Sequence, residues 1–410
     1  MMKSIYFIAF FVVLTAFCSA QQTSPSLRQI QVDVVYLASN LLQGRETGKA
    51  GEQMAADYIV SRFTEIGLKP LPGNQAQWYQ PFEFDYNENP HATEGGEHRT
   101  GHNVIGFIDN GAPTTVVIGA HYDHLGMGMP MASLYTGDPA IHNGADDNAS
   151  GVAAMLLLAE KLVQSPAKNN NYLFIGFSGE ELGLYGSKYF TNHPPIDLSS
   201  INYMLNMDMV GRLNEERTLA VYGVGTSPVW KEELETINNG RFKIKTTESG
   251  IGPSDHTSFY LKNIPVLHFF TGQHKDYHKP TDDSEHINYS GINEIAGFMY
   301  ALIEKMDAKG KLAFTKTKDE QKQGASFKVT LGVMPDYVYD GEGMRIDAVM
   351  DDRPAKSAGI QGGDIIVKIG DVEVKTIYDY MEGLSKFKKG DSTEVKVKRG
   401  KKILKKKVTF

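Results

Sequence analysis

The sequence predicts an α/β fold: a three-layer sandwich around a mixed, largely parallel central sheet, followed by a small β-rich domain. Two observations predict it. Apolar runs of strand length alternate with amphipathic runs of helical length over residues 26–306, which is typical of parallel strands joined by crossover helices. After a polar stretch at 306–323 the chain continues as a compact β-rich segment long enough to fold alone.

The predicted elements begin with helices. Residues 26–67 have helical character, with a break at Gly44 and Gly48. Before Gly67, apolar residues recur at the spacing of one helix face: Ala55, Ala56, Ile59, Val60 and Phe63. Further helices are predicted at 151–163, 230–238 and 291–306, and strands at 103–107, 115–118, 171–177, 201–209, 217–222 and 264–270.

Composition and charge limit the function classes. The 410 residues are too many for one ordinary domain and suit two. The 42 basic and 49 acidic side chains give a net charge of −7, which argues against a general nucleic-acid binder. A single cysteine, Cys18, excludes a disulfide framework and any cysteine-built metal site. A metal would therefore be bound by carboxylates and histidines, and the 12 histidines all lie between His91 and His286.

Residues 1–20 are predicted to be a secretory signal peptide. Lys3 precedes an apolar run that ends at Phe17, and small residues follow up to Ala20. The run is shorter than the roughly 20 residues of a membrane span, so no transmembrane anchor is expected in the mature chain. Lipoprotein anchoring through Cys18 is disfavoured because the bulky Phe17 precedes it. The mature protein is expected to be periplasmic or secreted and to contain no cysteine.

The rest of the chain is predicted to contain a domain at 21–308, a linker at 309–324 and a second domain at 325–410. The linker has a polar composition without apolar periodicity. The end of the second domain alternates apolar and basic residues around Arg399 and Gly400, which predicts a terminal hairpin with lysines outward. These lysines are interpreted as a solvated face that protects a sheet edge, in preference to a surface for binding anions.

Acidic and histidine side chains gather in five short segments next to the ends of predicted strands or the start of a helix. The segments are 119–126, 144–151, 177–183, 206–211 and 274–280. Each alone has an ordinary explanation, such as a hydrogen-bonded pair, a helix cap or a solvated loop. Together they lie where open α/β sheets build their sites, just outside strand ends. Two histidines with three carboxylates form the ligand set of a two-zinc centre.

The local geometry of these segments supports a shared site. On an extended chain His121 and Asp123 point the same way, so the carboxylate can orient the imidazole. Glu180 and Glu181 can serve one site only on a turn. Asp208 is an acid among apolar residues on a predicted buried strand and needs a cation nearby, because a buried unpaired carboxylate is costly.

These segments resemble the co-catalytic zinc exopeptidases of metallopeptidase family 28, of the bacterial leucyl aminopeptidase and aminopeptidase Y type. The resemblance covers about residues 25–310 and includes 44–51 and 254–256. It implies two Zn²⁺ ions per chain and a cis peptide after the bridging aspartate, between Asp146 and Asp147, and it assigns no role to His124. The implied roles are His121 and Asp208 on one zinc, Glu181 and His278 on the other, Asp146 as the bridging ligand, Glu180 as general base and Asp123 as the residue that orients His121.

The resemblance implies an exported aminopeptidase that hydrolyses N-terminal residues from peptides with a metal-activated water. Glutaminyl cyclase activity on the same fold is one alternative. A carboxypeptidase is another, because the ligands do not show which end of a peptide is read. An inactive peptide-binding scaffold is a third. The Asp146-Asp147-Asn148 sequence, the complete ligand set and Glu180 favour two metals and hydrolysis.

The pattern at 357–371 resembles PDZ domains, particularly the bacterial ones attached to exported proteases. PDZ domains bind a peptide as an added strand and hold its terminal carboxylate with loop amides. The resemblance implies that a helix near 378–384 forms one wall of the groove and that the C-terminus of a peptide is the ligand. The carboxylate-binding loop is then expected at Thr330, Leu331, Gly332 and Val333. A module that only packs on the peptidase is the alternative.

Overall fold

The computed structural model describes residues 25–87, 96–129, 132–317, 329–336, 339, 341–349 and 353–410. The predicted signal peptide at 1–20 lies outside these residues, as does the part of the predicted linker beyond residue 317. Within the described residues, no helix combines the length and the apolar character that crossing a membrane requires.

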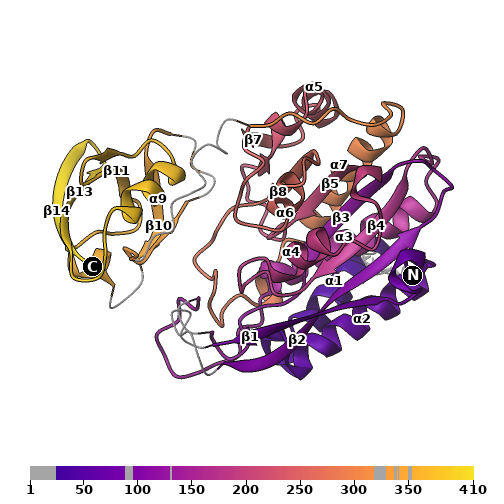
Figure 1. Ribbon diagram of the computed structural model, residues 1–410, viewed down its shortest axis with the longest axis horizontal. Coiled ribbons are helices and arrows are strands. Elements are labelled where there is room, and N and C mark those ends of the chain that lie inside the picture. Colours follow the sequence, from indigo (N-terminus) through magenta and orange to yellow (C-terminus); the bar gives the residue numbers. More distant parts are fainter. Residues whose placement is uncertain are drawn as a thin grey trace, which may run out of the picture.

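The first domain is built on a mixed sheet of eight strands among the described residues (Figure 1). The strand order is β1-β2-β4-β3-β5-β8-β6-β7, and the central strands β4, β3, β5 and β8 run parallel to one another. The pairs β1–β2, β2–β4 and β6–β8 are antiparallel, so the predicted mixed, largely parallel sheet is confirmed. The strands are β1 (Tyr79–Tyr86), β2 (Glu97–Ile108), β3 (Thr115–His121), β4 (Asn171–Phe177), β5 (Ile201–Met207), β6 (Thr218–Tyr222), β7 (Lys243–Thr247) and β8 (Val266–Phe270).

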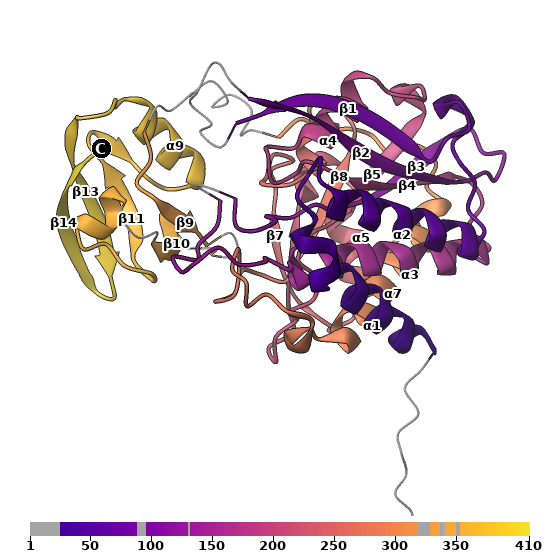
Figure 2. The same cartoon turned by 90° about the horizontal axis from the view of Figure 1, so that it is seen from below.

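Helices cover both faces of this sheet (Figure 2). Successive side chains of a strand point to opposite faces, so Val116 and Ile118 of β3 join one apolar core and Val117 joins another. The first core also contains side chains of α1, α2, α3, α5 and α7, and the second contains side chains of α4 and α6. The helices are α1 (Pro25–Leu37), α2 (Ala50–Ile66), α3 (Gly151–Val163), α4 (Tyr185–Asn192), α5 (Trp230–Asn238), α6 (His256–Tyr260) and α7 (Tyr289–Asp307).

The predicted break in the first helical region is a short turn, η1 (Asn40–Arg45). Gly44 has a φ of 71°, a backbone angle that residues with a Cβ rarely adopt. A Cβ at Gly44 would lie 2.5 Å from the carbonyl oxygen of Gly126. The glycine therefore allows η1 to approach the loop that follows β3, next to the predicted site.

Helix α3 is apolar on nearly all sides, because it lies against the sheet and also against α1 and α7. The chain enters α3 through a π-helical turn, η3 (Ala145–Ser150), in which all six residues are buried. Asn148 in this turn donates hydrogen bonds to the backbone oxygens of His121 and Met207, the last residues of β3 and β5. The turn therefore holds Asp146 and Asp147 next to the carboxyl ends of these two strands.

The apolar pattern does not predict β1, β7, α4 or α6. Strands β1 and β7 are the two edge strands, and their side chains are largely half-buried or exposed, so neither forms an apolar run. Helix α6 has five residues and is too short to show helical periodicity.

Part of the predicted linker packs on the first domain. The Thr315 amide donates to the carbonyl oxygen of Thr226 (2.8 Å), and the Tyr260 hydroxyl lies 2.8 Å from Thr317 Oγ1. Leu312 and Phe314 also pack against the apolar cores of this domain. Two apolar side chains and a few hydrogen bonds leave no apolar periodicity in the sequence, which explains why composition alone suggested an unstructured segment.

The C-terminal unit has its own sheet and its own apolar core. The strands lie in the order β14-β13-β11-β10-β9, with β12 paired to β11. The predicted terminal hairpin is confirmed, because β13 and β14 pair around Gly400, with Lys405 and Lys407 exposed and Val397 buried. The elements are β9 (Val333–Pro335), β10 (Met344–Val349), α8 (Pro354–Ser357), β11 (Ile365–Ile369), β12 (Val372–Glu373), α9 (Ile377–Ser385), β13 (Ser392–Arg399) and β14 (Lys402–Thr409).

Candidate active site

The candidate site lies at the carboxyl ends of the parallel strands β4, β3, β5 and β8. His121 ends β3, Glu180 and Glu181 follow β4, Asp208 follows β5, and His278 lies in the segment after β8. Because these strands are parallel neighbours, their carboxyl ends meet at one edge of the sheet. Contacts among their side chains bring the predicted segments together there.

Asp147 occupies the centre of this cluster. Its Oδ1 atom lies 3.3 Å from His121 Nε2, and its Oδ2 atom lies 3.2 Å from His278 Nε2. On one side, Asp208 Oδ1 is 3.3 Å from the same nitrogen of His121. On the other, Glu181 Oε2 is 3.3 Å from His278 Nε2. The site therefore contains two groups of metal-type ligands that share one carboxylate.

Asp146, which was expected to be the shared carboxylate, points away from this cluster. Its Oδ1 atom accepts hydrogen bonds from the Gly211 amide (2.6 Å) and from Ser150 Oγ (2.9 Å). Its Oδ2 atom lies 3.1 Å from His274 Nε2. The prediction for Asp146 is wrong by one residue, because adjacent side chains in the η3 turn point in different directions. Asp146 instead anchors the segment that follows β5.

The cis peptide bond also lies one residue later than expected, between Asp147 and Asn148. Asn148 connects the surrounding elements. Its Oδ1 atom accepts hydrogen bonds from the amides of Gly151 (3.0 Å) and Met209 (3.1 Å), and its Nδ2 atom donates to the carbonyl oxygens of His121 and Met207. Asn148 thus fixes the position of Asp147 relative to β3, β5 and α3.

Asp123 lies behind His121, as the sequence predicts for a residue that orients this ring. Asp123 Oδ1 is 3.5 Å from His121 Nδ1 and accepts a hydrogen bond from the Glu180 amide (3.2 Å). Its Oδ2 atom accepts from Thr47 Oγ1 (3.0 Å) and from the Glu181 amide (3.4 Å). One buried carboxylate therefore contacts both the first imidazole and the turn that carries the two glutamates.

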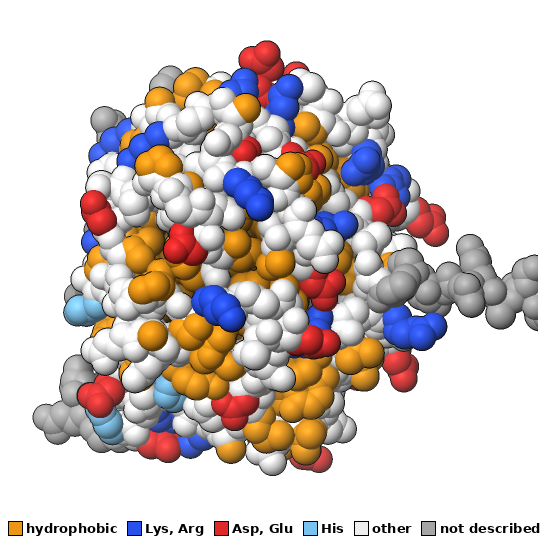
Figure 3. Space-filling model, turned by 90° about the vertical axis from the view of Figure 1, so that its right-hand side faces the viewer, with side chains coloured by type: hydrophobic (Ala, Val, Ile, Leu, Met, Phe, Trp, Pro, Cys, Tyr) orange, Lys and Arg blue, Asp and Glu red, His pale blue; other side chains and the backbone are white. Residues whose placement is uncertain are grey.

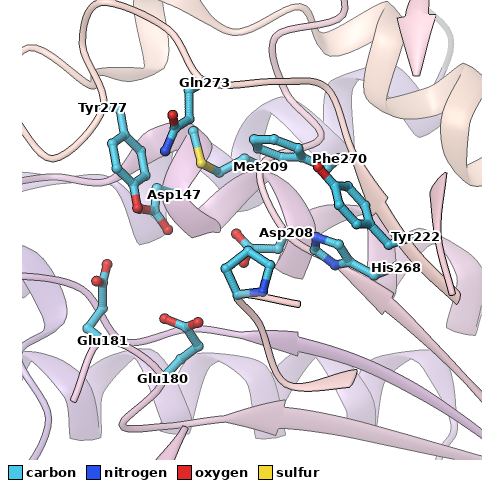
Figure 4. Close-up of a pocket in the computed structure, with 11 residues that line it drawn as sticks. Asp147, Glu180, Glu181, Asp208, Met209, Tyr222, His268, Phe270, Gln273 and Tyr277 are labelled. Atoms are coloured by element: carbon cyan, nitrogen blue, oxygen red, sulfur yellow. The ribbon is translucent and has the colours of Figure 1, made fainter. Parts of the chain in front are cut away.

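The two glutamates face the other acids across a pocket (Figure 4). The pocket is lined by Asp147, Glu180, Glu181, Asp208, Met209, Tyr222, Pro253, His268, Phe270, Gln273 and Tyr277. Four carboxylates line it together with the aromatic rings of Tyr222, Phe270 and Tyr277. Such a wall can hold cations and an apolar side chain at the same time.

Burial and charge shift the pKa values in this cluster. Burial raises the pKa of Glu180 well above its ordinary range, and the nearby charges of Asp208 and Glu181 raise it further against the opposing effect of His121. Burial alone would raise the pKa of Asp147, but contacts with His121, His124 and His278 hold it well below the ordinary range. Perturbed groups of this kind are typical of catalytic sites.

The donor set fits divalent metal ions. One trio consists of His121, Asp147 and Asp208, and its ligand atoms lie within 4.8 Å of one another. A second trio, His124, Asp147 and Glu181, meets the same limit. Nε2 of His278 is buried and has no hydrogen-bond partner among the described residues, although it faces two carboxylates. Imidazole nitrogens and carboxylate oxygens are the ligands that zinc prefers when thiolates are absent.

No role was predicted for His124 from its position in the sequence. Its Nδ1 atom lies 2.8 Å from Glu181 Oε1 and 3.8 Å from Asp147 Oδ2, and the residue is fully buried. The ring also meets that of His278 edge-on, with 5.8 Å between the centroids. A signal was present, because His124 lies one residue from Asp123 in the same segment, but alternation along a strand would have pointed it away. The chain leaves the strand at His121, so that alternation does not apply.

Two further supporting residues come from elements far away in the sequence. Arg45 donates to the carbonyl oxygens of Tyr122 (2.7 Å), Asn143 (2.6 Å) and Gly144 (2.9 Å) and also contacts that of Leu37. Asp282 Oδ2 accepts hydrogen bonds from the amides of Asp146 (2.9 Å) and Asp147 (3.0 Å). Burial lowers the pKa of Arg45 to about 10, so the guanidinium stays charged at neutral pH among several acids. No local sequence pattern reveals contacts between residues so far apart in the chain.

Two known protein families match this chain. Residues 103–303 match the model of peptidase family M28, and residues 313–410 match that of the PDZ domain. The chain carries a peptidase family M28 domain. The PDZ match begins before the predicted boundary at 325, in the segment that packs on the M28 domain, and the exact domain limits stay predictions.

Curated relatives of the M28 domain include aminopeptidases. Aminopeptidase YwaD of Bacillus subtilis is 29% identical over 245 residues, which cover 56% of this chain and 49% of that protein. Leupeptin-inactivating enzyme 1 of Streptomyces exfoliatus is 29% identical over 257 residues, covering 59% and 48%. The chain thus matches about half the length of these relatives.

Solved structures share the fold of the M28 domain. A zinc aminopeptidase from Bacillus subtilis superimposes with a TM-score of 0.53 at 19% identity, covering 70% of this chain and 98% of the other. Glutaminyl cyclase from Porphyromonas gingivalis superimposes with a TM-score of 0.55 at 16% identity, covering 68% and 98%. The predicted zinc-exopeptidase type of sandwich is thereby confirmed, and the shared fold alone does not decide between these two activities.

Proposed function

We propose that this chain is an exported aminopeptidase that binds two Zn²⁺ ions and hydrolyses N-terminal residues from peptides. The observation that carries the proposal is the pair of ligand groups that meet at Asp147. With one ion, part of this buried carboxylate cluster would have no compensating charge, which is unfavourable. Two cations match the four acids Asp147, Glu180, Glu181 and Asp208.

In this proposal His121 and Asp208 would hold one ion, Glu181 and His278 would hold the other, and Asp147, in place of Asp146, would contribute to both. When bound, zinc acts as a Lewis acid on the scissile carbonyl and lowers the pKa of a coordinated water to about 7. Asp123 keeps the His121 ring oriented through the contact at Nδ1.

Glu180 is proposed as the general base. It lines the pocket beside the ligands, and its pKa is raised by burial and by neighbouring acids. A carboxylate with a raised pKa can take a proton from the attacking water and then deliver it to the leaving amine. Its neighbour Glu181 cannot share this role while it holds a metal.

The charge of the pocket favours the amino end of a peptide. Four acids line it, and none of the described lining residues is lysine or arginine. Two Zn²⁺ ions would balance these acids, so the absence of a basic side chain carries the argument: a C-terminal carboxylate would need such a partner, whereas a free α-amine does not. This argument supports an aminopeptidase over a carboxypeptidase, which the sequence left open.

The direct test measures zinc content and substrate choice on the same preparation. We expect two zinc ions per chain, release of p-nitroaniline from amino-acid p-nitroanilides, and no cleavage of N-acetylated peptides. One zinc with cyclisation of N-terminal glutaminyl peptides would instead establish glutaminyl cyclase activity. Release of C-terminal residues from N-acetylated peptides would establish a carboxypeptidase, and zinc binding without any turnover would establish a scaffold.

Export and peptide binding by the PDZ domain are further parts of the proposal. Export is supported by the pattern at residues 1–20, and N-terminal sequencing of the mature protein should begin at Gln21 in a periplasmic or secreted fraction. Peptide binding is supported by the loop at Thr330, Leu331, Gly332 and Val333, which directly precedes or begins β9, and by helix α9. A C-terminal peptide library that shows no binding to the full chain would favour a module that only packs on the peptidase.

A further inference from the structure

One nitrogen of His278 faces the proposed metal site, and the other is held by a loop at 132–142. His278 Nδ1 lies 2.9 Å from the carbonyl oxygen of Ala132, and the Leu134 amide donates to the carbonyl oxygen of His278 (3.0 Å). A carbonyl oxygen only accepts hydrogen bonds, so Nδ1 must carry the proton. Nε2 then faces Asp147 and Glu181 and is the ring nitrogen available to a metal ion.

The loop is closed on itself by a pair of side chains, Ser133 and His142. Ser133 Oγ lies 2.7 Å from His142 Nε2, and His142 Nδ1 lies 2.9 Å from the carbonyl oxygen of Ala140. The carbonyl fixes the proton of His142 on Nδ1, so Nε2 accepts from the serine hydroxyl. Ser133 Oγ in turn accepts from the Tyr135 amide (3.1 Å). The hydrogen bonds therefore run in one order: the Tyr135 amide donates to Ser133 Oγ, the Ser133 hydroxyl donates to His142 Nε2, and His142 Nδ1 donates to the Ala140 carbonyl oxygen.

His142 connects the loop to the body of the domain. Its side chain is buried, with 1% of the residue exposed, and its amide donates to the carbonyl oxygen of Gly126 (2.8 Å). The Gly126 amide donates in turn to the carbonyl oxygen of Gly44 (3.0 Å) in η1. Gly128, with a φ of 100°, leaves room for the ring, because a Cβ there would lie 2.9 Å from His142 Cε1. The ring is thus a fixed point against which Ser133 is held.

We propose that Ser133 and His142 are positioning residues for His278: their hydrogen bond holds the Ala132 carbonyl where it keeps the proton on His278 Nδ1 and turns Nε2 toward the metal. The inference rests on the proposed function, since it assigns His278 to a metal ion. Partners of this kind behind a ligand histidine fix its tautomer and ring orientation, and their loss weakens metal binding roughly 10–100-fold. Ser133 and His142 belong to the loop and touch none of the reacting groups.

The test compares three variants of the full-length zinc-loaded chain. Ser133→Ala removes the hydroxyl, Ser133→Thr keeps it, and Thr136→Ala removes an exposed hydroxyl from the same loop as a matched control. Chelator competition measures the affinity of each zinc ion, and NMR of ¹⁵N-histidine-labelled protein measures exchange of the His278 Nδ1 proton with water. The His278 signals are assigned by their absence in His278→Gln.

We expect Ser133→Ala to lower the affinity for one zinc ion about tenfold or more and to accelerate exchange of the His278 Nδ1 proton with water. Ser133→Thr should restore both properties, and Thr136→Ala should change neither. His142→Leu should reproduce the loss, and the double variant with Ser133→Ala should add little, because both changes break the same hydrogen bond. Wild-type affinity and exchange in Ser133→Ala, or an equal loss in Thr136→Ala, would overturn the inference. If the unsubstituted chain binds fewer than two zinc ions, the proposed function fails, while the exchange measurement still tests the hold on His278.

Discussion

Asp147 brings two negatively charged oxygens into a buried space that also receives the rings of His121, His124 and His278. Asp146, its neighbour, is equally buried but satisfies its oxygens with a backbone amide, a hydroxyl and His274. The two acids therefore have the same chemistry and burial and differ only in what their oxygens contact. This difference can be measured.

Substituting each of these aspartates by asparagine should separate the two roles. Asp147→Asn removes the shared charge, so we expect zinc affinity at both positions to fall by more than the roughly 10–100-fold that loss of an outer-shell partner costs, together with activity. Asp146→Asn should keep two zinc ions and instead lose about 1–3 kcal/mol of unfolding free energy, because a buried acceptor is altered. Metal analysis and urea denaturation of both variants check this. Retention of two tightly held ions in Asp147→Asn would return the bridge to Asp146.

The proposed role of Glu180 as general base can be separated from metal binding. Glu180→Gln keeps the shape of the side chain and removes its ability to accept a proton, so we expect turnover to fall roughly 10²–10⁴-fold. Zinc content should stay at the wild-type value, because Glu180 is not one of the proposed ligands. Paired measurements of turnover and metal content are decisive here: unchanged turnover would remove Glu180 from the role of base, and loss of zinc would make it a ligand.

The sequence predicted which segments would meet, because metal-type side chains beside strand ends converge in any open α/β sheet. It failed where two candidates stood side by side. Asp146 and Asp147 cannot be ranked without the backbone of the η3 turn, and His124 points into the site only because the chain leaves β3 at His121. Contacts of Arg45 and Asp282 join segments about 100 or more residues apart, which no local pattern encodes.

Arg45 connects the elements around the site through hydrogen bonds to their backbones. The guanidinium links η1 to the end of β3 and to the segment before η3 through several backbone carbonyls. Backbone carbonyls at loop ends have no sheet partners, so one buried arginine satisfies acceptors that would otherwise be unpaired.

Arg45→Lys should therefore be costly although the charge is kept. A single ammonium group cannot reach the carbonyls of Tyr122, Asn143 and Gly144 together, so we expect a loss of about 2–3 kcal/mol in the free energy of unfolding. Arg28→Lys, on the exposed side of α1, is the matched control and should stay within about 0.5 kcal/mol of wild type. Equal stability of the two variants in urea titrations would show that the carbonyls find other partners.

In the PDZ domain, Asp364 and Arg399 join the start of β11 to the end of β13. Arg399 Nε lies 2.6 Å from Asp364 Oδ1, and Arg399 Nη2 lies 2.7 Å from Oδ2. Burial opposes ionisation of Asp364, but the hydrogen bonds from Arg399 and from the Gln361 amide lower its pKa below the ordinary value of 3.8. The folded domain therefore holds the charged form more strongly than the unfolded chain does.

The sign of the pH dependence follows from this shift. A depressed pKa stabilises the fold above the unfolded value of about 3.9, and the stabilisation is lost as the pH falls through the lower folded value. We expect the melting temperature of the PDZ domain to fall on acidification from pH 5 to pH 3, and Asp364→Asn to be less stable at pH 5 and less dependent on pH. Asp371→Asn, at an exposed position, serves as the control. A pH profile of Asp364→Asn that parallels wild type would exclude this pair as the cause.

The central strands of the sheet were predictable from the sequence, and the edge strands were not. The central strands β3, β4, β5 and β8 are covered on both faces and form continuous apolar runs. Edge strand β7 has the sequence Lys-Ile-Lys-Thr-Thr and is largely exposed, so its strand structure depends on pairing with β6, which composition does not report.

The whole molecule contains separate apolar cores in the two domains. The cores of the M28 domain, on either side of its sheet, share no residue with the PDZ core formed by residues such as Ile366, Val395 and Val397. Charged side chains of both signs are scattered among hydrophobic ones over the face of the molecule in Figure 3. That face shows no continuous basic surface.

Separate cores predict separate unfolding transitions, and only one of them should respond to metal. Zinc bound to the native M28 domain stabilises it by RT ln(1 + [Zn]/Kd), or about 2.7 kcal/mol when free zinc is 100 times Kd. Scanning calorimetry of the full chain should show two transitions, and a chelator should lower the one that belongs to the M28 domain while leaving the other in place. Asp364→Asn identifies the PDZ transition independently, because it should move only that one at pH 5. A single transition that shifts as a whole on chelation would mean that the PDZ domain depends on the peptidase for its stability, and would favour a packing role over peptide binding.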